Sequence, residues 1–97
     1  MSLEDDVDHV ISTVSSERAL AANLRTSGAS DRDLDLVGDL LVQIARVLSG
    51  DRSAARTYKY PYIARIVNES WSSASPLANE LAEVERSFLH LQNSGGA

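Results

Sequence analysis

The segment 34–48 constrains the fold most, because its apolar residues recur at helical spacing around more than half of a helix. A helix that is apolar over so much of its surface must pack against several neighbours, so this segment predicts the central helix of a bundle. Ser30 or Asp31 is expected to cap its start, and Gly50 to end it. Gly38 indicates a close helix crossing, because glycine inside a helix otherwise costs about 1 kcal/mol relative to alanine. The apolar positions are Leu34, Leu36, Val37, Leu40, Leu41, Ile44, Ala45, Val47 and Leu48.

Two further segments carry a narrower apolar stripe at helical spacing and predict two more helices. The first covers residues 3–25, starts after the capping residue Ser2, and has Ser15-Ser16 as a candidate break. The second covers residues 61–72 and starts at a proline, a residue that suits the first turn of a helix. The side chains of this second helix that we expect to face inward are Ile63, Ile66, Val67, Ser70 and Trp71.

A fourth helix is predicted over residues 76–92, where Ser75 acts as the cap and Pro76 occupies the first helical position. No stretch of strand length alternates between apolar and polar residues. The predicted fold is therefore all-α, a compact four-helix bundle with an irregular connection around residues 50–60, in which Asp51 or Ser53 caps a short turn. The apolar positions of the last helix are Leu77, Leu81, Val84, Phe88 and Leu91.

The length of 97 residues fits one helical domain, predicted to cover residues 1–93 and to be followed by a frayed tail at 94–97. The chain has no cysteine, which excludes disulfides, thiolate metal sites and a cysteine nucleophile. No apolar run approaches the roughly 20 residues that cross a bilayer. The N-terminus is acidic where a signal peptide is basic, so we expect a cytoplasmic protein with no membrane partner.

The net charge is −5, but positive charge is concentrated in residues 46–65. This segment also contains all three tyrosines. Tyrosine and arginine are enriched in binding hot spots, because one offers a large rigid face and the other a planar fork of donors. We therefore predict a partner-binding segment made by Arg52, Arg56, Tyr58, Lys59, Tyr60, Tyr62 and Arg65.

This segment has three interpretations. Contact with another protein would make the chain a small non-enzymatic binding module of the regulatory, adaptor or inhibitor type. Contact with nucleic acid is the alternative, because basic residues interleaved with aromatics suit a single strand, although the flanking acids oppose a long phosphate path. In the third interpretation the tyrosines fill one end of the bundle and the basic residues bridge to acidic helices. The apolar surface of 34–48 also predicts a homodimer that covers what the other helices leave exposed.

The acids at Asp31, Asp33 and Asp35 have the spacing that begins a calcium loop. An EF-hand requires glycine and then glutamate at the positions that Leu36 and Val42 occupy here, so an EF-hand is excluded. These acids are instead expected to stabilise a helix N-terminus.

An enzyme component that depends on metal or on phosphotransfer is the weakest hypothesis. His9 follows Asp5 at a spacing that allows two metal ligands, but no third ligand is visible by spacing. His90 lacks the following lysine that phosphotransfer domains usually carry. We predict no catalytic residue, metal or cofactor. A solvated acidic face is expected to contain Glu80, Glu83 and Glu85.

Overall fold

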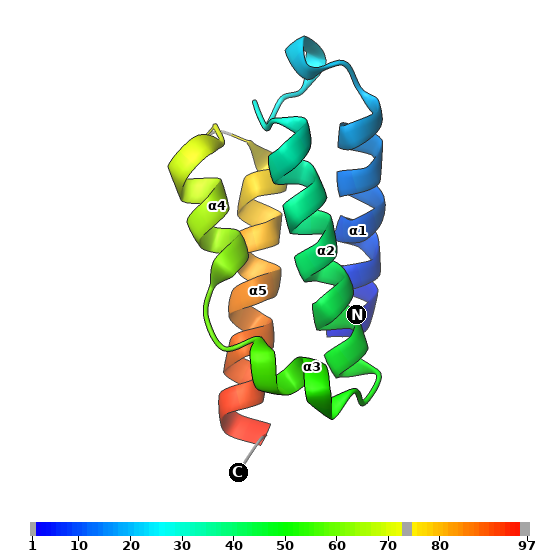
Figure 1. Ribbon diagram of the computed structural model, residues 1–97, viewed down its shortest axis with the longest axis vertical. Coiled ribbons are helices and arrows are strands. Elements are labelled where there is room, and N and C mark those ends of the chain that lie inside the picture. The colour runs from blue at the N-terminus through cyan, green and yellow to red at the C-terminus, as the bar shows by residue number, and fades with distance from the viewer. Residues whose placement is uncertain (1, 73–74, 96–97) are drawn as a thin grey trace.

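Four helices run side by side along the molecule, and a short one crosses one end of them (Figure 1). The structure, a computed structural model, describes residues 2–72 and 75–95. Within these residues there is no β-strand, and the all-α prediction is confirmed. The helices are α1 (Leu3–Ala19), α2 (Asp31–Leu48), α3 (Arg52–Thr57), α4 (Tyr62–Ser70) and α5 (Pro76–Gly95), with a 3₁₀ turn at Ala22–Leu24.

Successive long elements alternate in direction, as in an up-and-down four-helix bundle (Figure 1). Helix α1 packs against α2 and α5, and α4 packs against the same two helices from another side. The short helix α3 packs on α2 and forms the irregular connection that was predicted around residues 50–60. This arrangement leaves α2 and α4 adjacent along one side of the molecule.

Four helix starts are capped by the residues that the sequence indicates. The side chains of Ser2, Ser30, Asp51 and Ser75 each accept a hydrogen bond from a backbone N–H in the first turn, at 2.9–3.3 Å. Such caps satisfy N–H groups that have no partner inside the helix. Local sequence therefore fixes where α1, α2, α3 and α5 begin.

Apolar side chains from all four long elements form one core between the helices. Helix α2 supplies the centre of this core with Leu34, Val37, Leu41 and Ile44, all fully buried. From α5, the buried apolar residues are Leu77, Ala78, Leu81, Val84 and Phe88. The position of α2 at the centre agrees with its wide apolar stripe.

Part of the surface of α2 is not covered by the other helices. Leu36 and Val42 on α2 are 42% and 43% exposed. The predicted close helix crossing at Gly38 is wrong, because no neighbouring atom lies within 4 Å of the place where a Cβ would stand. The uncovered side of α2 is therefore open surface.

Helix α1 passes through Ser15-Ser16 without a break and ends at Ala19, earlier than the predicted residue 25. Arg25 explains this early end. Its side chain is buried and donates hydrogen bonds of 3.0–3.2 Å to the carbonyl oxygens of Glu17, Arg18 and Ala29. Carbonyls in the last turn of a helix have no internal partner, so the guanidinium caps α1 from the loop that follows.

Arg25 also forms an ion pair of 2.6 Å with Asp31, the first residue of α2. The hydrogen bond from Arg25 holds the pKa of Asp31 below its usual value, and the charge of Arg18 acts in the same direction. A lowered pKa in the folded state means that this contact stabilises the fold above about pH 4 and is lost as the pH falls further. The contact links the end of α1 to the start of α2.

The later helices differ slightly from their predicted bounds. Helix α4 is shorter than the predicted 61–72, and on it Ile63 and Val67 are buried. Trp71 is buried as well, whereas Ser70 is exposed. Helix α5 continues into the predicted tail, and residues 96–97 lie outside the described chain.

Leu91, predicted to face the core from α5, is exposed. Among the described residues, no helix combines the length and apolar character that crossing a bilayer requires.

We expect Arg25→Ala to lower the free energy of unfolding by at least about 3 kcal/mol, because hydrogen bonds from a charged donor are each worth about 1.5–3 kcal/mol. The free energy of unfolding of Arg25→Lys should lie between those of Arg25→Ala and the unmodified protein, since an ammonium group lacks the planar fork of donors. Urea unfolding followed by Trp71 fluorescence measures both. The control is Arg32→Ala, which removes an exposed arginine that forms no ion pair with the described residues. Equal stability of the two alanine variants would show that Arg25 does not hold the end of α1.

Candidate protein-binding surface

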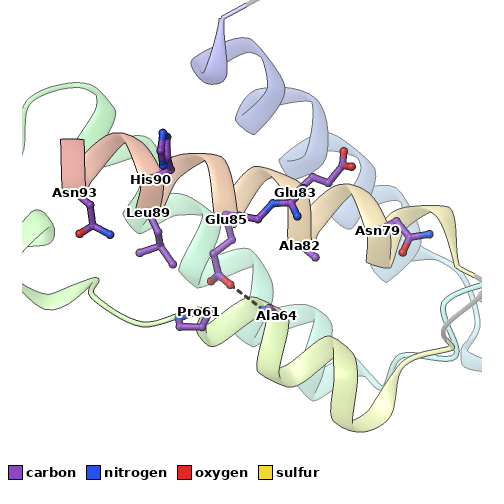
Figure 2. A pocket seen from close by; sticks show the side chains of 10 residues that line it. Pro61, Ala64, Asn79, Ala82, Glu83, Glu85, Leu89, His90 and Asn93 are labelled. Atoms are coloured by element: carbon purple, nitrogen blue, oxygen red, sulfur yellow. Dashed lines mark hydrogen bonds between the residues drawn. The ribbon is translucent and has the colours of Figure 1, made fainter. Parts of the chain in front are cut away.

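A buried carboxylate on α5 holds the chain at the start of α4. Glu85 is fully buried, and its Oε2 accepts hydrogen bonds from the Tyr58 hydroxyl and from the backbone N–H of Ile63, the latter at 2.7 Å. Its Oε1 accepts from the backbone N–H of Ala64 at 2.9 Å (Figure 2). These N–H groups lie in the first turn of α4, where the helix dipole favours a negative charge. Glu85 therefore caps α4 from a neighbouring helix.

Tyr58 is fixed by the same group of contacts. Its backbone carbonyl accepts a hydrogen bond of 3.0 Å from Gln92 Nε2 on α5. Its ring packs edge-on against Phe88 and Tyr62, with centroids 5.3 and 5.4 Å apart. The prediction that Tyr58 contacts a partner is wrong, because the ring is fully buried. Burial raises the pKa of the Tyr58 phenol well above its usual value, and the hydrogen bond and charge of Glu85 raise it further.

The other two tyrosines lie at the surface. The exposed fraction is 66% for Tyr60 and 38% for Tyr62, and their rings meet edge-on at 6.0 Å. Because Tyr58 is anchored on α5 and its ring supports Tyr62, the backbone that carries the exposed rings is held in one position. The tyrosines therefore divide into one internal anchor and two external rings.

An open groove of about 690 Å³ begins at Tyr62 and runs between α4 and α2. Its apolar lining includes the exposed Leu36 and the half-buried Leu40 and Ile66. Charged and polar groups stand along both walls. The residues that line this α2–α4 groove are Leu36, Asp39, Leu40, Gln43, Tyr62, Arg65, Ile66 and Glu69.

The predicted basic residues do not all share this surface. Arg65 lines the groove and forms an exposed ion pair of 3.3 Å with Glu69, one helical turn later. Arg52 and Arg56 lie on α3, which crosses the end of the bundle, and Lys59 follows it (Figure 1). These three side chains are exposed and form no ion pair within 4.0 Å in the described part of the chain. The structure therefore does not show the predicted bridges to acidic helices.

A second groove, of about 860 Å³, lies between α4 and α5 (Figure 2). Glu85 belongs to its lining, but both carboxylate oxygens already accept hydrogen bonds from the chain itself. This carboxylate therefore serves to hold α4. The remaining lining residues are Pro61, Ala64, Asn79, Ala82, Glu83, Arg86, Leu89, His90 and Asn93.

The predicted acidic face of α5 contains Glu80 and Glu83, which are exposed, but not the buried Glu85. His9 on α1 lies beside this face, with its Nε2 at 3.9 Å from a carboxylate oxygen of Glu80. Residues 2–72 and 75–95 contain no group of three or more histidine, aspartate or glutamate side chains placed to hold a metal ion.

Sequence reasoning placed Glu85 on a solvated face and missed Gln92, although both hold the candidate surface from inside the bundle. A signal for Glu85 exists, because it follows Leu81 by four residues and precedes Phe88 by three. This spacing places it on the buried stripe of α5. A charged residue on such a stripe indicates a buried partner, since an unpaired charge is rarely buried.

Comparison of the chain with protein-family models, with curated proteins and with solved structures finds no match. The functional argument therefore depends on the surface itself.

Tyr58→Phe should lower the free energy of unfolding by about 1–3 kcal/mol at neutral pH, because it removes one hydrogen bond to a buried carboxylate. The raised pKa of Tyr58 means that its contribution is complete below about pH 10 and is lost as the pH rises further, by up to about 1.4 kcal/mol per pH unit. The difference between parent and Tyr58→Phe should therefore shrink above pH 10. Unfolding in urea at several pH values measures this difference. Tyr60→Phe is the exposed control, and a similar loss in it would contradict the anchoring role of Tyr58.

Proposed function

We propose that this protein is a small, non-enzymatic, cytoplasmic protein-binding module of the regulatory, adaptor or inhibitor type. It contacts its partner through Tyr60, Tyr62 and Arg65 together with the α2–α4 groove. The observation that carries this proposal is the exposure of two tyrosine rings beside an apolar groove, on a backbone that is held from inside by Glu85.

The chemistry of this surface suits a protein partner. Aromatic rings and an arginine are the side chains that contribute most to binding energy at protein interfaces. Leu36, Leu40 and Ile66 supply apolar area next to them, and burying such area is favourable by about 25 cal/mol per Å². Because the anchored backbone is already ordered, binding loses less conformational entropy than it would on a mobile loop.

The proposal predicts a site-specific crosslink. Tyr62→p-benzoylphenylalanine, expressed in the native host and irradiated, should yield a covalent adduct with a protein. Val42→p-benzoylphenylalanine is the matched control, because Val42 has an exposure similar to that of Tyr62 but does not line the groove. Mass spectrometry of the adducts identifies the captured chain. Leu36→p-benzoylphenylalanine is a second probe, because Leu36 also lines the groove. If neither position 62 nor position 36 gave an adduct that is absent at position 42, the proposed surface would be wrong.

Binding of nucleic acid is the second candidate function. It is supported by the basic side chains of Arg52, Arg56 and Lys59, which are exposed and form no ion pair with the described residues. Two of them stand one helical turn apart on α3 and so share a face.

If the second function holds, single-stranded nucleic acid should bind with an affinity that falls steeply as salt increases, by roughly one power of the salt ratio for each phosphate contact. Fluorescence anisotropy with a labelled oligonucleotide measures this. Substituting Arg52, Arg56 and Lys59 together by glutamate should abolish binding, whereas Arg86→Glu, a charge reversal on α5, should have a smaller effect. Absence of binding at low salt would exclude this alternative.

A further inference from the structure

We propose that the partner in the α2–α4 groove is a second copy of this chain, related to the first by a two-fold axis along the groove. The inference rests on the proposed function, because it assigns an occupant to the same surface. It follows from the register of α4 against α2, from the signs of charge on the two walls, and from the placement of the exposed apolar residues.

The register is set by a contact at one end of the groove. The Ser70 hydroxyl at the end of α4 donates a hydrogen bond of 2.7 Å to Asp33 Oδ2 in the first turn of α2. The two helices are antiparallel, so both extend from this contact toward the end of the bundle that α3 crosses (Figure 1). At a rise of about 1.5 Å per residue, Arg65 lies about 7.5 Å from the contact along α4, and Asp39 lies about 9 Å from it along α2. Arg65 and Asp39 therefore stand at nearly the same level on opposite walls.

A two-fold axis along the groove places α2 of each copy over α4 of the other and keeps every residue at its own level. Asp39 of one copy then faces Arg65 of the second copy, and the same pair forms again on the other side of the axis. A two-fold interface requires a surface that complements itself in this way. Opposite charges at equal levels on facing walls meet that requirement.

Both charged groups are available for such pairs. Asp39 forms no ion pair or hydrogen bond through its side chain with the rest of the described residues. Among residues 2–72 and 75–95, the Arg65 side chain is engaged only by Glu69, in an exposed pair of 3.3 Å between residues four apart. Exposed pairs of this kind contribute little to stability, so Arg65 exchanges this partner at little cost.

The apolar residues complete the self-complementary pattern. Leu36 and Ile66 stand toward the Ser70 end of the groove, while Tyr62 and Leu40 stand on the other side of the charged level. In the two-fold arrangement, Leu36 of one copy meets the Ile66 region of the other, and Leu40 meets the Tyr62 region. The dimer thus covers the side chains of Leu36 and Tyr62, which are 42% and 38% exposed in the single chain. This pairing accounts for the exposure of Leu36, the part of the open surface of α2 that lines the groove.

The test is a charge exchange read by sedimentation equilibrium. The unmodified protein should show a monomer–dimer equilibrium between about 10 μM and about 1 mM. Asp39→Arg creates arginine–arginine contacts across the axis, and Arg65→Asp creates aspartate–aspartate contacts. Each variant alone should dimerise at least about tenfold more weakly, since like charges that face one another oppose association. An equimolar mixture of the two variants should recover dimers, because every facing pair in the mixed dimer is again of opposite sign.

Matched controls are Asp8→Arg and Arg56→Asp, which reverse exposed charges outside the groove. These should dimerise like the parent, and circular dichroism confirms that all variants remain folded. Three results would overturn the inference: a parent that stays monomeric at about 1 mM, single groove variants that dimerise like the parent, or a mixture that fails to recover.

The outcomes separate this inference from the proposed function. A monomeric parent whose position 62 crosslinks to a different protein overturns the two-fold dimer and supports the binding module. A monomeric parent that crosslinks to nothing at positions 62 and 36 overturns both. A mixture that recovers dimers, together with adducts of the chain to itself, supports both.

Discussion

The bonding of the Glu85 carboxylate is the interaction on which the outward surface depends. Helix α4 begins directly after Pro61, which provides no side-chain cap, so its first N–H groups need an acceptor from elsewhere. Glu85 supplies this acceptor and also receives the Tyr58 hydroxyl, which gives a buried carboxylate three donors. Burying a charge is favourable only when its hydrogen-bonding capacity is met in this way. Glu85 therefore holds the start of α4 and supports the exposed rings beside it.

Arg25, whose charge is opposite to that of Glu85, holds the C-terminal end of α1. There a buried cation binds backbone carbonyls at a helix C-terminus, whereas Glu85 binds backbone N–H groups at a helix N-terminus. Each charge lies where the helix dipole favours its sign. A chain of this size has a modest core, and these two contacts fix the helix ends that local capping does not define. The ionic groups inside the bundle therefore act on chain geometry as well as on stability.

The sequence predicts the elements whose determinants are local. The four helical stripes and the caps at Ser2, Ser30, Asp51 and Ser75 are all visible as short patterns, so the all-α fold follows from them. The candidate site is predicted only in part, because the division between inner and outer tyrosines depends on a residue of another helix. Nothing near Tyr58 in the sequence shows that Glu85 lies opposite it. Likewise, the early end of α1 depends on Arg25, whose side chain folds back onto the last turn of the helix. The spacing of apolar residues alone does not distinguish this arrangement from a helix that continues to residue 25.

Glu85 accepts hydrogen bonds from the Tyr58 hydroxyl and from the Ile63 backbone N–H, and these two donors lie on either side of a short turn. One inserted or deleted residue in that turn would move one donor out of reach, so the length of the connection is fixed while its outward side chains are free to vary. Lys59 and Tyr60 occupy such free positions. The backbone of this connection is therefore fixed, while its exposed side chains can be substituted. Such substitutions can change which partner the surface binds without changing the helices.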